Sequence, residues 1–250
     1  MSQIRIVINC VVAALTIMAS AVTAQQNAPT LSAPDLSGSF SISPLRLDLA
    51  QSSEFTNLTL TNALDRRSSV QIRIFAWRQE GGKDIYAPTT DFVASPSIFT
   101  MPAGAQQQIH IIRAQPLPGA REQHYRVVVD QLPEAAQGKN QAAATRLQLT
   151  LPLFVGSEQA RPAQLSAAIN GTRLTITNSG GRTARIGVLT VVSNDGRRWP
   201  INLENGRYVQ GQSMLTFDVP RFDCTRAGAL RVAGTIDRAA FDVPPQTRCP

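Results

Sequence analysis

The sequence predicts an all-β protein built from two sandwich domains, and two patterns carry that prediction. Apolar residues occupy every second position over most of the chain, as Val70, Ile72 and Ile74 do, and this period is typical of half-buried strands. Turn-forming groups such as Gly81-Gly82-Lys83 and Pro102-Ala103-Gly104 separate the runs. Short strands punctuated at such intervals indicate antiparallel sandwiches.

An internal echo predicts two copies of this architecture. Leu58-Thr59-Leu60-Thr61-Asn62 recurs as Leu174-Thr175-Ile176-Thr177-Asn178, near the start of each half. We therefore divide the chain into a signal peptide (1–24), a flexible N-terminal arm (25–37), an N-terminal sandwich (38–155), a linker (156–162) and a C-terminal sandwich (163–250).

The N-terminus has the pattern of an export signal. Arg5 precedes an apolar run over residues 6–22, and Val22-Thr23-Ala24 places small residues where a signal peptidase cleaves. A membrane anchor is the alternative, but the run contains Asn9 and lies at the short end of the roughly 17–25 residues that a span needs. No later stretch is apolar enough to span, so we expect no membrane span in the mature chain.

Cysteine usage agrees with an oxidising compartment. Cys10 leaves with the signal, so Cys224 and Cys249 remain as a pair, which we expect to form a disulfide worth on the order of 3 kcal/mol. Metal binding is the alternative, although two isolated cysteines with the distant His110 and His124 make a poor ligand set.

The chain is basic, with a formal net charge of +7. Its cations are spread singly along the predicted strands rather than clustered, so we interpret most of them as solvated and expect no nucleic-acid partner. A few cations remain available for an anionic group of another partner.

No catalytic arrangement is visible in the sequence. Nucleophilic catalysis needs Ser or Cys beside His and a carboxylate, yet both histidines lie inside predicted strands and no Gly-x-Ser-x-Gly elbow is present. We therefore expect a binding protein rather than an enzyme, with no catalytic residues, metal or cofactor.

A set of motifs in the N-terminal half points to a family. In chain order they are Ser43-Pro44-Leu45-Arg46-Leu47, residues 58–62, Phe75-Ala76-Trp77-Arg78-Gln79, Ser95-Pro96-Ser97-Ile98-Phe99, Pro102-Ala103-Gly104, Glu122 through Tyr125-Arg126, Leu132-Pro133 and Leu151-Pro152-Leu153-Phe154-Val155. With these motifs the chain resembles the periplasmic pilus (fimbrial) chaperones of the chaperone-usher pathway, particularly their archaic branch. The resemblance implies two immunoglobulin-like β-sandwich domains at an angle, with an interdomain cleft.

The resemblance also implies a function in the periplasm. Such chaperones bind pilus subunits, which are incomplete immunoglobulin-like domains, by lending them a strand, and deliver them to an outer-membrane usher. The implied donor residues are Ala143, Thr145, Leu147 and Leu149. Leu151 and Leu153 should face the protein's own core, and the same orientation is the alternative for Leu147 and Leu149.

The family anchors the subunit's terminal carboxylate with an arginine and a lysine. Arg46 matches the arginine, but Pro152 stands in place of the lysine, so Arg113 or Arg126 is the candidate second cation. We expect one strand with Leu45, Leu47 and Leu49 on one face, and solvent with an Asp48 ion pair is the alternative environment for Arg46.

Two rival functions remain open. One is a secreted tandem immunoglobulin-like adhesion or structural module, which would keep its strands to itself. The other is a periplasmic hydrolase or enzyme accessory.

Overall fold

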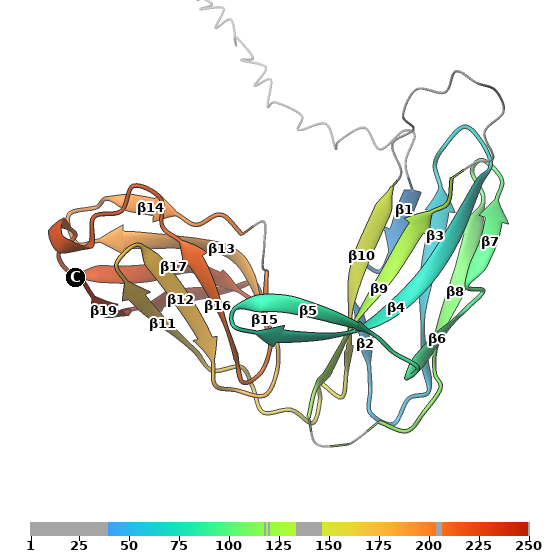
Figure 1. Ribbon diagram of the computed structural model, residues 1–250, viewed down its shortest axis with the longest axis horizontal. Helices are drawn as coiled ribbons and strands as arrows, with labels where there is room; N and C mark the ends of the chain where they lie inside the picture. Colours follow the sequence, from blue (N-terminus) through green and yellow to red (C-terminus); the bar gives the residue numbers. More distant parts are fainter. Residues whose placement is uncertain (1–39, 118, 120, 134–146, 204–206, 250) are drawn as a thin grey trace, which may run out of the picture. The chain divides into compact units, whose positions relative to one another are not determined.

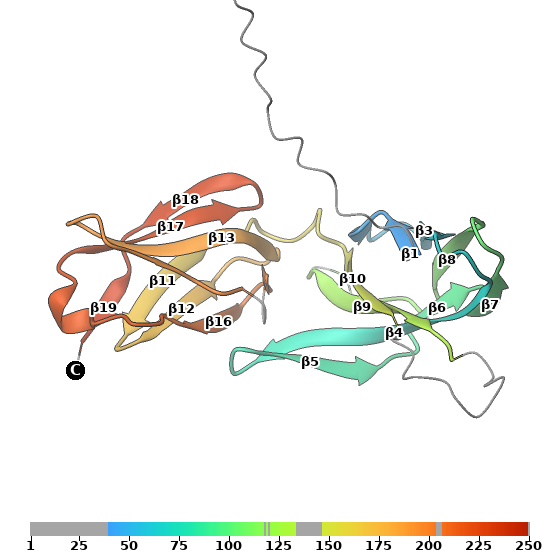
Figure 2. The same ribbon diagram turned by 90° about the horizontal axis from the view of Figure 1, so that it is seen from above.

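The computed structural model describes residues 40–117, 119, 121–133, 147–203 and 207–249. In this part the chain forms two β-sandwiches, one from β1 to β10 and one from β11 to β19 (Figure 1), seen from a second direction in Figure 2. The one helix of the described residues is a short 3-10 turn, Cys224–Arg226. The predicted all-β, two-sandwich fold is thus confirmed.

The first sandwich packs a four-stranded sheet against a six-stranded one. The four-stranded sheet has the order β1 (Phe40–Ser43), β3 (Phe55–Asn62), β8 (Gln106–Arg113) and β6 (Phe92–Ser95). The six-stranded sheet has the order β2 (Leu47–Leu49), β10 (Gln148–Val155), β9 (Gln123–Gln131), β4 (Ser68–Glu80) and β5 (Lys83–Pro88), with β7 (Ile98–Met101) also paired to β4.

The second sandwich repeats the arrangement with smaller sheets. One has the order β16 (Ser213–Asp218), β12 (Arg173–Asn178), β11 (Leu165–Asn170) and β19 (Gln246–Arg248). The other has the order β14 (Arg198–Pro200), β13 (Ala184–Ser193), β17 (Leu230–Ile236) and β18 (Ala239–Val243), with β15 (Tyr208–Val209) also paired to β13. Each sandwich has a separate apolar core between its sheets.

The repeated five-residue motif forms equivalent strands, β3 and β12, and in each it ends in a buried asparagine. Asn62 and Asn178 are fully buried. Each donates its side-chain amide to the carbonyl four residues ahead, of Arg66 at 2.9 Å and of Arg182 at 2.8 Å, and each accepts the N–H two residues ahead. Because a buried amide needs these partners, the asparagine fixes the turn after the strand in both sandwiches.

The single first strand expected around Ser43-Pro44-Leu45-Arg46-Leu47 was wrong. β1 ends at Ser43 in one sheet and β2 begins at Leu47 in the other, so the chain changes sheets between them. Leu45 lies in this crossing and is 73% exposed, whereas Leu47 and Leu49 are 1% and 4% exposed. Side chains alternate between faces only while the backbone stays in one strand, which explains why Leu45 departs from the pattern.

The predicted disulfide is present. Cys224 in the 3-10 turn is bonded to Cys249, which follows β19, with the two Cα atoms 5.5 Å apart. The bond ties the end of the described chain to the second sandwich.

Candidate functional site

The last strand of the first sandwich, β10, is paired on both edges over only part of its length. β9 pairs with all of it, antiparallel, from Gln148 to Val155. β2 runs parallel to β10 on the other edge and pairs only with Leu153–Val155. Among the described residues no strand pairs with this edge from Gln148 to Pro152, so it is open.

Backbone hydrogen bonds show which groups face the open edge. Gln131 donates its N–H to the carbonyl of Leu147 at 2.9 Å, so the odd-numbered residues of this strand turn their backbone groups toward β9. Gly156 donates to the carbonyl of Leu49 at 3.0 Å, so the even-numbered residues turn theirs toward β2 and the open edge.

The open edge therefore presents the N–H groups and the carbonyls of Gln148 and Thr150. Pro152 has no N–H, and the missing donor falls on the open edge rather than in the ladder with β9. The edge offers the donors and acceptors that an added strand requires.

The predicted donor residues lie only partly within the described chain. Leu151 and Leu153 are 2% and 0% exposed in the protein's own core, as expected. Leu147 and Leu149 are half-buried and pack against the same core at the open end of β10. Ala143 and Thr145 lie outside the described residues.

Arg46 lies where the paired part of the edge ends. Its guanidinium donates to both carboxylate oxygens of Asp48, at 2.7 to 3.1 Å, and lies 4.4 Å from the centre of the Phe154 ring. The hydrogen bond to Asp48 raises the pKa of Arg46. The Asp48 ion pair expected as the alternative is present, and the side chain of Arg46 still keeps 34% of its surface exposed.

Arg126 on β9 is the register partner of Pro152. Its guanidinium lies 3.7 Å from the Trp77 ring centre and 5.5 Å from that of Tyr208, and only 12% of its side chain is exposed. Its guanidinium forms a loose ion pair with Asp84, at 3.9 Å. Its Nε is buried without a hydrogen-bond partner among the described residues.

The structure separates the two candidate second cations. Leu47 pairs with Leu153, so Arg46 comes next to Pro152 in the register, and Arg46 and Arg126 flank Pro152 from neighbouring strands. Two strand spacings are about 10 Å, within reach of two arginine side chains. Arg113, in contrast, belongs to the four-stranded sheet, where it donates to the carbonyls of Ala50 and Gln51 at 3.3 and 2.8 Å.

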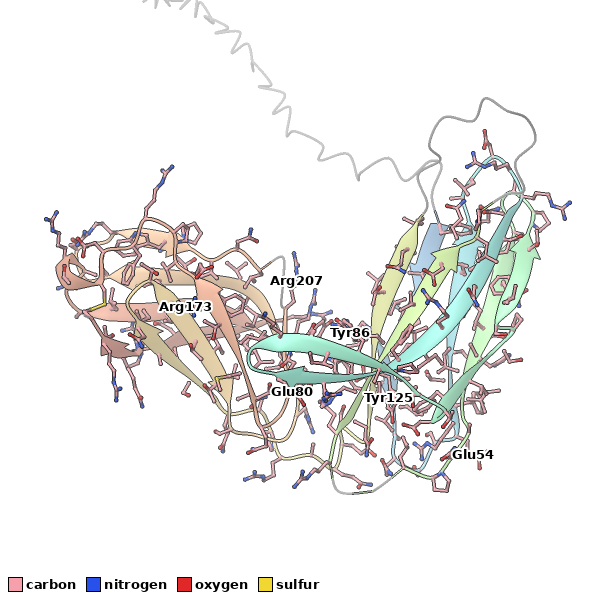
Figure 3. The ribbon with its side chains drawn as sticks, viewed as in Figure 1. Glu54, Glu80, Tyr86, Tyr125, Arg173 and Arg207 are labelled. Carbon is pink, nitrogen blue, oxygen red and sulfur yellow. A yellow bond between two sulfur atoms is a disulfide. The ribbon has the colours of Figure 1, made fainter. Side chains whose placement is uncertain are left out.

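A cavity of about 680 Å³ adjoins this row of residues. Its walls come from the outer face of β4, β5, β9 and β10 and from Arg207 and Tyr208 of the second sandwich. Figure 3 labels Tyr86 on β5 and Arg207, two of these residues. The charged side chains in the walls are Arg73, Arg126, Arg207 and Asp84.

Glu122 joins the two sandwiches beside the same region. Its fully buried carboxylate accepts the backbone N–H of Thr183 at 2.7 Å, the hydroxyl of Ser157 at 2.6 Å and Nε2 of His124 at 3.0 Å. Burial raises the pKa of Glu122, but the hydrogen bonds from His124, Ser157 and Thr183 outweigh burial and lower it to about 2. Sequence reasoning had treated Glu122 only as part of a motif.

Gln79 makes a second connection between the sandwiches. Its amide donates to the carbonyl of Tyr208 at 2.7 Å and accepts the N–H of Gln210 at 3.0 Å. The ring of Tyr208 is thereby held near Trp77, 5.9 Å between centroids.

Two kinds of feature are absent from the described residues. No helix there has the length and hydropathy needed to cross a membrane. Nor do three or more His, Cys, Asp or Glu side chains of the described ranges gather into a group that could hold a metal ion.

Comparison with solved structures finds the same fold in several chaperones. A chain of the CsuC–CsuE chaperone–tip adhesion subunit pre-assembly complex, from archaic Csu pili of Acinetobacter baumannii, is 20% identical, with a TM-score of 0.63 over 84% of this chain and 100% of that chain. The E. coli chaperone DraB is 18% identical, with a TM-score of 0.61 over 84% of this chain and 97% of DraB. The Salmonella enterica SafA pilin–SafB chaperone complex contains a chain that is 17% identical, with a TM-score of 0.61 over 83% of this chain and 96% of that chain.

Comparison by sequence gives the family. No curated protein matches the chain. The family model for the pili and flagellar-assembly chaperone, PapD N-terminal domain, matches residues 39–166, which is more than half of the sequence. The match contains the whole open edge of β10 together with Arg46 and Arg126, and the chain belongs to the pili and flagellar-assembly chaperone family.

Proposed function

We propose that the protein is a periplasmic chaperone of the archaic chaperone-usher branch, which caps incomplete pilus subunits by strand addition and delivers them to an outer-membrane usher. The open edge of β10, which ends beside Arg46, is the observation that carries this proposal. An added strand gains main-chain hydrogen bonds there, and alternate apolar side chains supply further affinity.

The site defines the direction of the client strand. β2 pairs with Leu153–Val155 on this edge of β10. The client strand pairs with the remaining part of the same edge, toward Gln148. A client whose terminal carboxylate reaches Arg46 must end where β2 begins, so it runs parallel to β10.

We further propose that Arg46 and Arg126 together bind this carboxylate. Arg126 is the register partner of Pro152, the Arg46 guanidinium lies 4.4 Å from the ring of Phe154 on the same strand as Pro152, and the Nε of Arg126 has no hydrogen-bond partner among the described residues. The planar fork of arginine suits a carboxylate with two oxygens. In the free protein the Arg46 guanidinium donates hydrogen bonds to Asp48. The client carboxylate therefore competes with Asp48 for the Arg46 guanidinium.

Trp77 provides an assay because it lies against Arg126. The chain has two tryptophans, so Trp199→Phe leaves Trp77 as the single fluorophore. A synthetic 12-residue peptide of alternating Val and Thr, with two added N-terminal lysines for solubility, is titrated as the free C-terminal acid and as the amide. The two peptides differ only in the terminal charge.

We expect the acid to bind about tenfold or more tightly than the amide, since a desolvated charge pair is worth roughly 2 kcal/mol or more. Arg46→Gln and Arg126→Gln should each bring this ratio toward one. Arg231→Gln is the matched control, because Arg231 is an exposed arginine of the second sandwich paired with Asp242. Equal binding of acid and amide by the single-tryptophan protein would contradict the proposed anchor.

The donor strand is tested by subunit capture from the periplasm. Leu149→Asp should abolish recovery of a one-to-one chaperone–subunit complex, because its carboxylate would be buried unpaired in an apolar groove, at a cost of several kcal/mol. Leu149 also packs against the chaperone's own core, so urea unfolding of the free variant must show that it is folded. Val188→Asp, at a 59% exposed position of β13 in the second sandwich, is the control. Wild-type protein that captures no subunit would favour the tandem adhesion module.

A further inference from the structure

The cavity beside the open edge is lined by more positive than negative side chains. Arg73, Arg126 and Arg207 line it, against one carboxylate, that of Asp84. Arg73 is neutralised by Asp130 at 2.7 Å, but no ion pair is recorded for Arg207 within the described chain. Asp84 is already bonded by Gln79 and Tyr86, at 2.8 and 3.1 Å. Among the described side chains of the site, positive charges therefore outnumber negative ones.

A client strand added to the open edge of β10 runs beside this cavity. Gln148 and Thr150 belong to its wall, and both present backbone groups to the open edge. Successive side chains of an added strand point to opposite faces of the sheet. Every second client residue therefore stands beside Thr150 or Gln148 on the cavity face, and the others face the apolar interior beside Leu149.

The two positions on the cavity face differ in charge. Gln148 pairs with Asp130 in the register and donates to its carboxylate at 2.6 Å. Thr150 pairs with Val128, and the next pair on the same face of the sheet, Pro152 with Arg126, contains an arginine. A client carboxylate beside Thr150 meets the arginines, whereas one beside Gln148 meets Asp130.

We propose that this cavity selects clients that carry an acidic side chain next to Thr150, close to their C-terminus, and that Arg207 recognises it, while Arg126 binds the terminal carboxylate. The inference rests on the proposed donor-strand function and adds a second anionic determinant to the terminal carboxylate. Rings of Phe75, Tyr86 and Tyr208 line the same cavity and add apolar surface to its walls.

The test is a charge scan along the client peptide. In the Trp199→Phe protein, each of the last six peptide positions is occupied in turn by Asp or by Asn, which have the same shape and differ in charge. We expect Asp to bind about threefold to fivefold more tightly than Asn at one position, the range of a partly exposed ion pair. Asp should bind more weakly at the two adjacent positions, whose side chains face the apolar interior.

Side-chain variants assign the preference to the cavity. Arg207→Gln should bring the Asp-to-Asn ratio at the favoured position to one and leave the acid-to-amide ratio of the peptide terminus unchanged. Arg231→Gln should change neither ratio. An Asp preference without alternation, or one that survives Arg207→Gln, overturns the inference.

The two levels of the proposal fail differently. A peptide that binds as the acid but not as the amide, and is indifferent to Asp at every position, overturns the acidic-residue inference alone. A peptide that binds in neither form overturns the donor-strand function, and the inference with it.

Discussion

Replacing Glu122 by glutamine removes one charge from the contact between the two sandwiches and keeps the side chain's shape. The ionised carboxylate accepts hydrogen bonds from Ser157, Thr183 and His124. An amide can accept on one atom only, so at least one of these donors loses its partner. The substitution therefore tests the charge and its hydrogen bonds together.

The pKa of Glu122 gives the magnitude. It falls from 4.5 to about 2, and one pKa unit is worth about 1.4 kcal/mol, so the ionised carboxylate contributes roughly 3 kcal/mol to the free energy of unfolding. The folded-state pKa is the lower one, so the contribution is complete above about pH 4.5. It is lost as the pH falls from there toward 2.

Urea unfolding at several pH values measures this contribution. At pH 7 Glu122→Gln should lower the free energy of unfolding by roughly 3 kcal/mol, and the difference from wild type should shrink steadily below pH 4.5. Glu54→Gln, at an exposed position (Figure 3), is the control and should have little effect. A loss of equal size at pH 7 and pH 2.5 would show that the hydrogen-bond pattern, not the charge, stabilises this contact, and would refute the reasoning.

Further predictions concern the second sandwich and the two buried asparagines. Replacing both Cys224 and Cys249 by alanine should destabilise the second sandwich by about 3 kcal/mol, and alkylation of the denatured wild-type protein should detect no free thiol. Asn62→Ala and Asn178→Ala should each cost about 1–3 kcal/mol, because buried carbonyls lose their donor; the exposed Asn170→Ala is the control, and urea unfolding is the measurement. A comparable loss of unfolding free energy for Asn170→Ala would show that Asn62 and Asn178 have no special role in fixing the turns.

The fold was predictable from local pattern because strand period and turn residues are properties of neighbouring residues. The error near Leu45 shows the limit of such a pattern. Leu45, Leu47 and Leu49 alternate without interruption in the sequence, yet the chain changes sheets before Leu47. A change of sheet is decided by which strand each segment pairs with, and alternation does not encode that choice.

The candidate site was predictable only where one short motif contains the residue. Arg46 could be named from its motif. The proposed preference for Arg126 over Arg113 could not, because it rests on which sheet each strand joins. Glu122 was missed for a related reason: two of its three partners, Ser157 and Thr183, are distant in sequence and come together only through the contact between sandwiches.

Pro152 occupies the one kind of position in β10 where a proline is compatible with both the fold and the proposed function. At an odd-numbered position a proline would remove a hydrogen bond to β9 and loosen the core strand that holds Leu151 and Leu153. At position 152 the missing N–H falls on the client edge, where it denies the client about one hydrogen bond, worth roughly 0.5–1.5 kcal/mol. The main-chain ladder is therefore weakest beside Arg46 and Arg126. In the proposed function, affinity at this end of the client strand has to come from the terminal carboxylate, and we expect capture to depend on a free chain end.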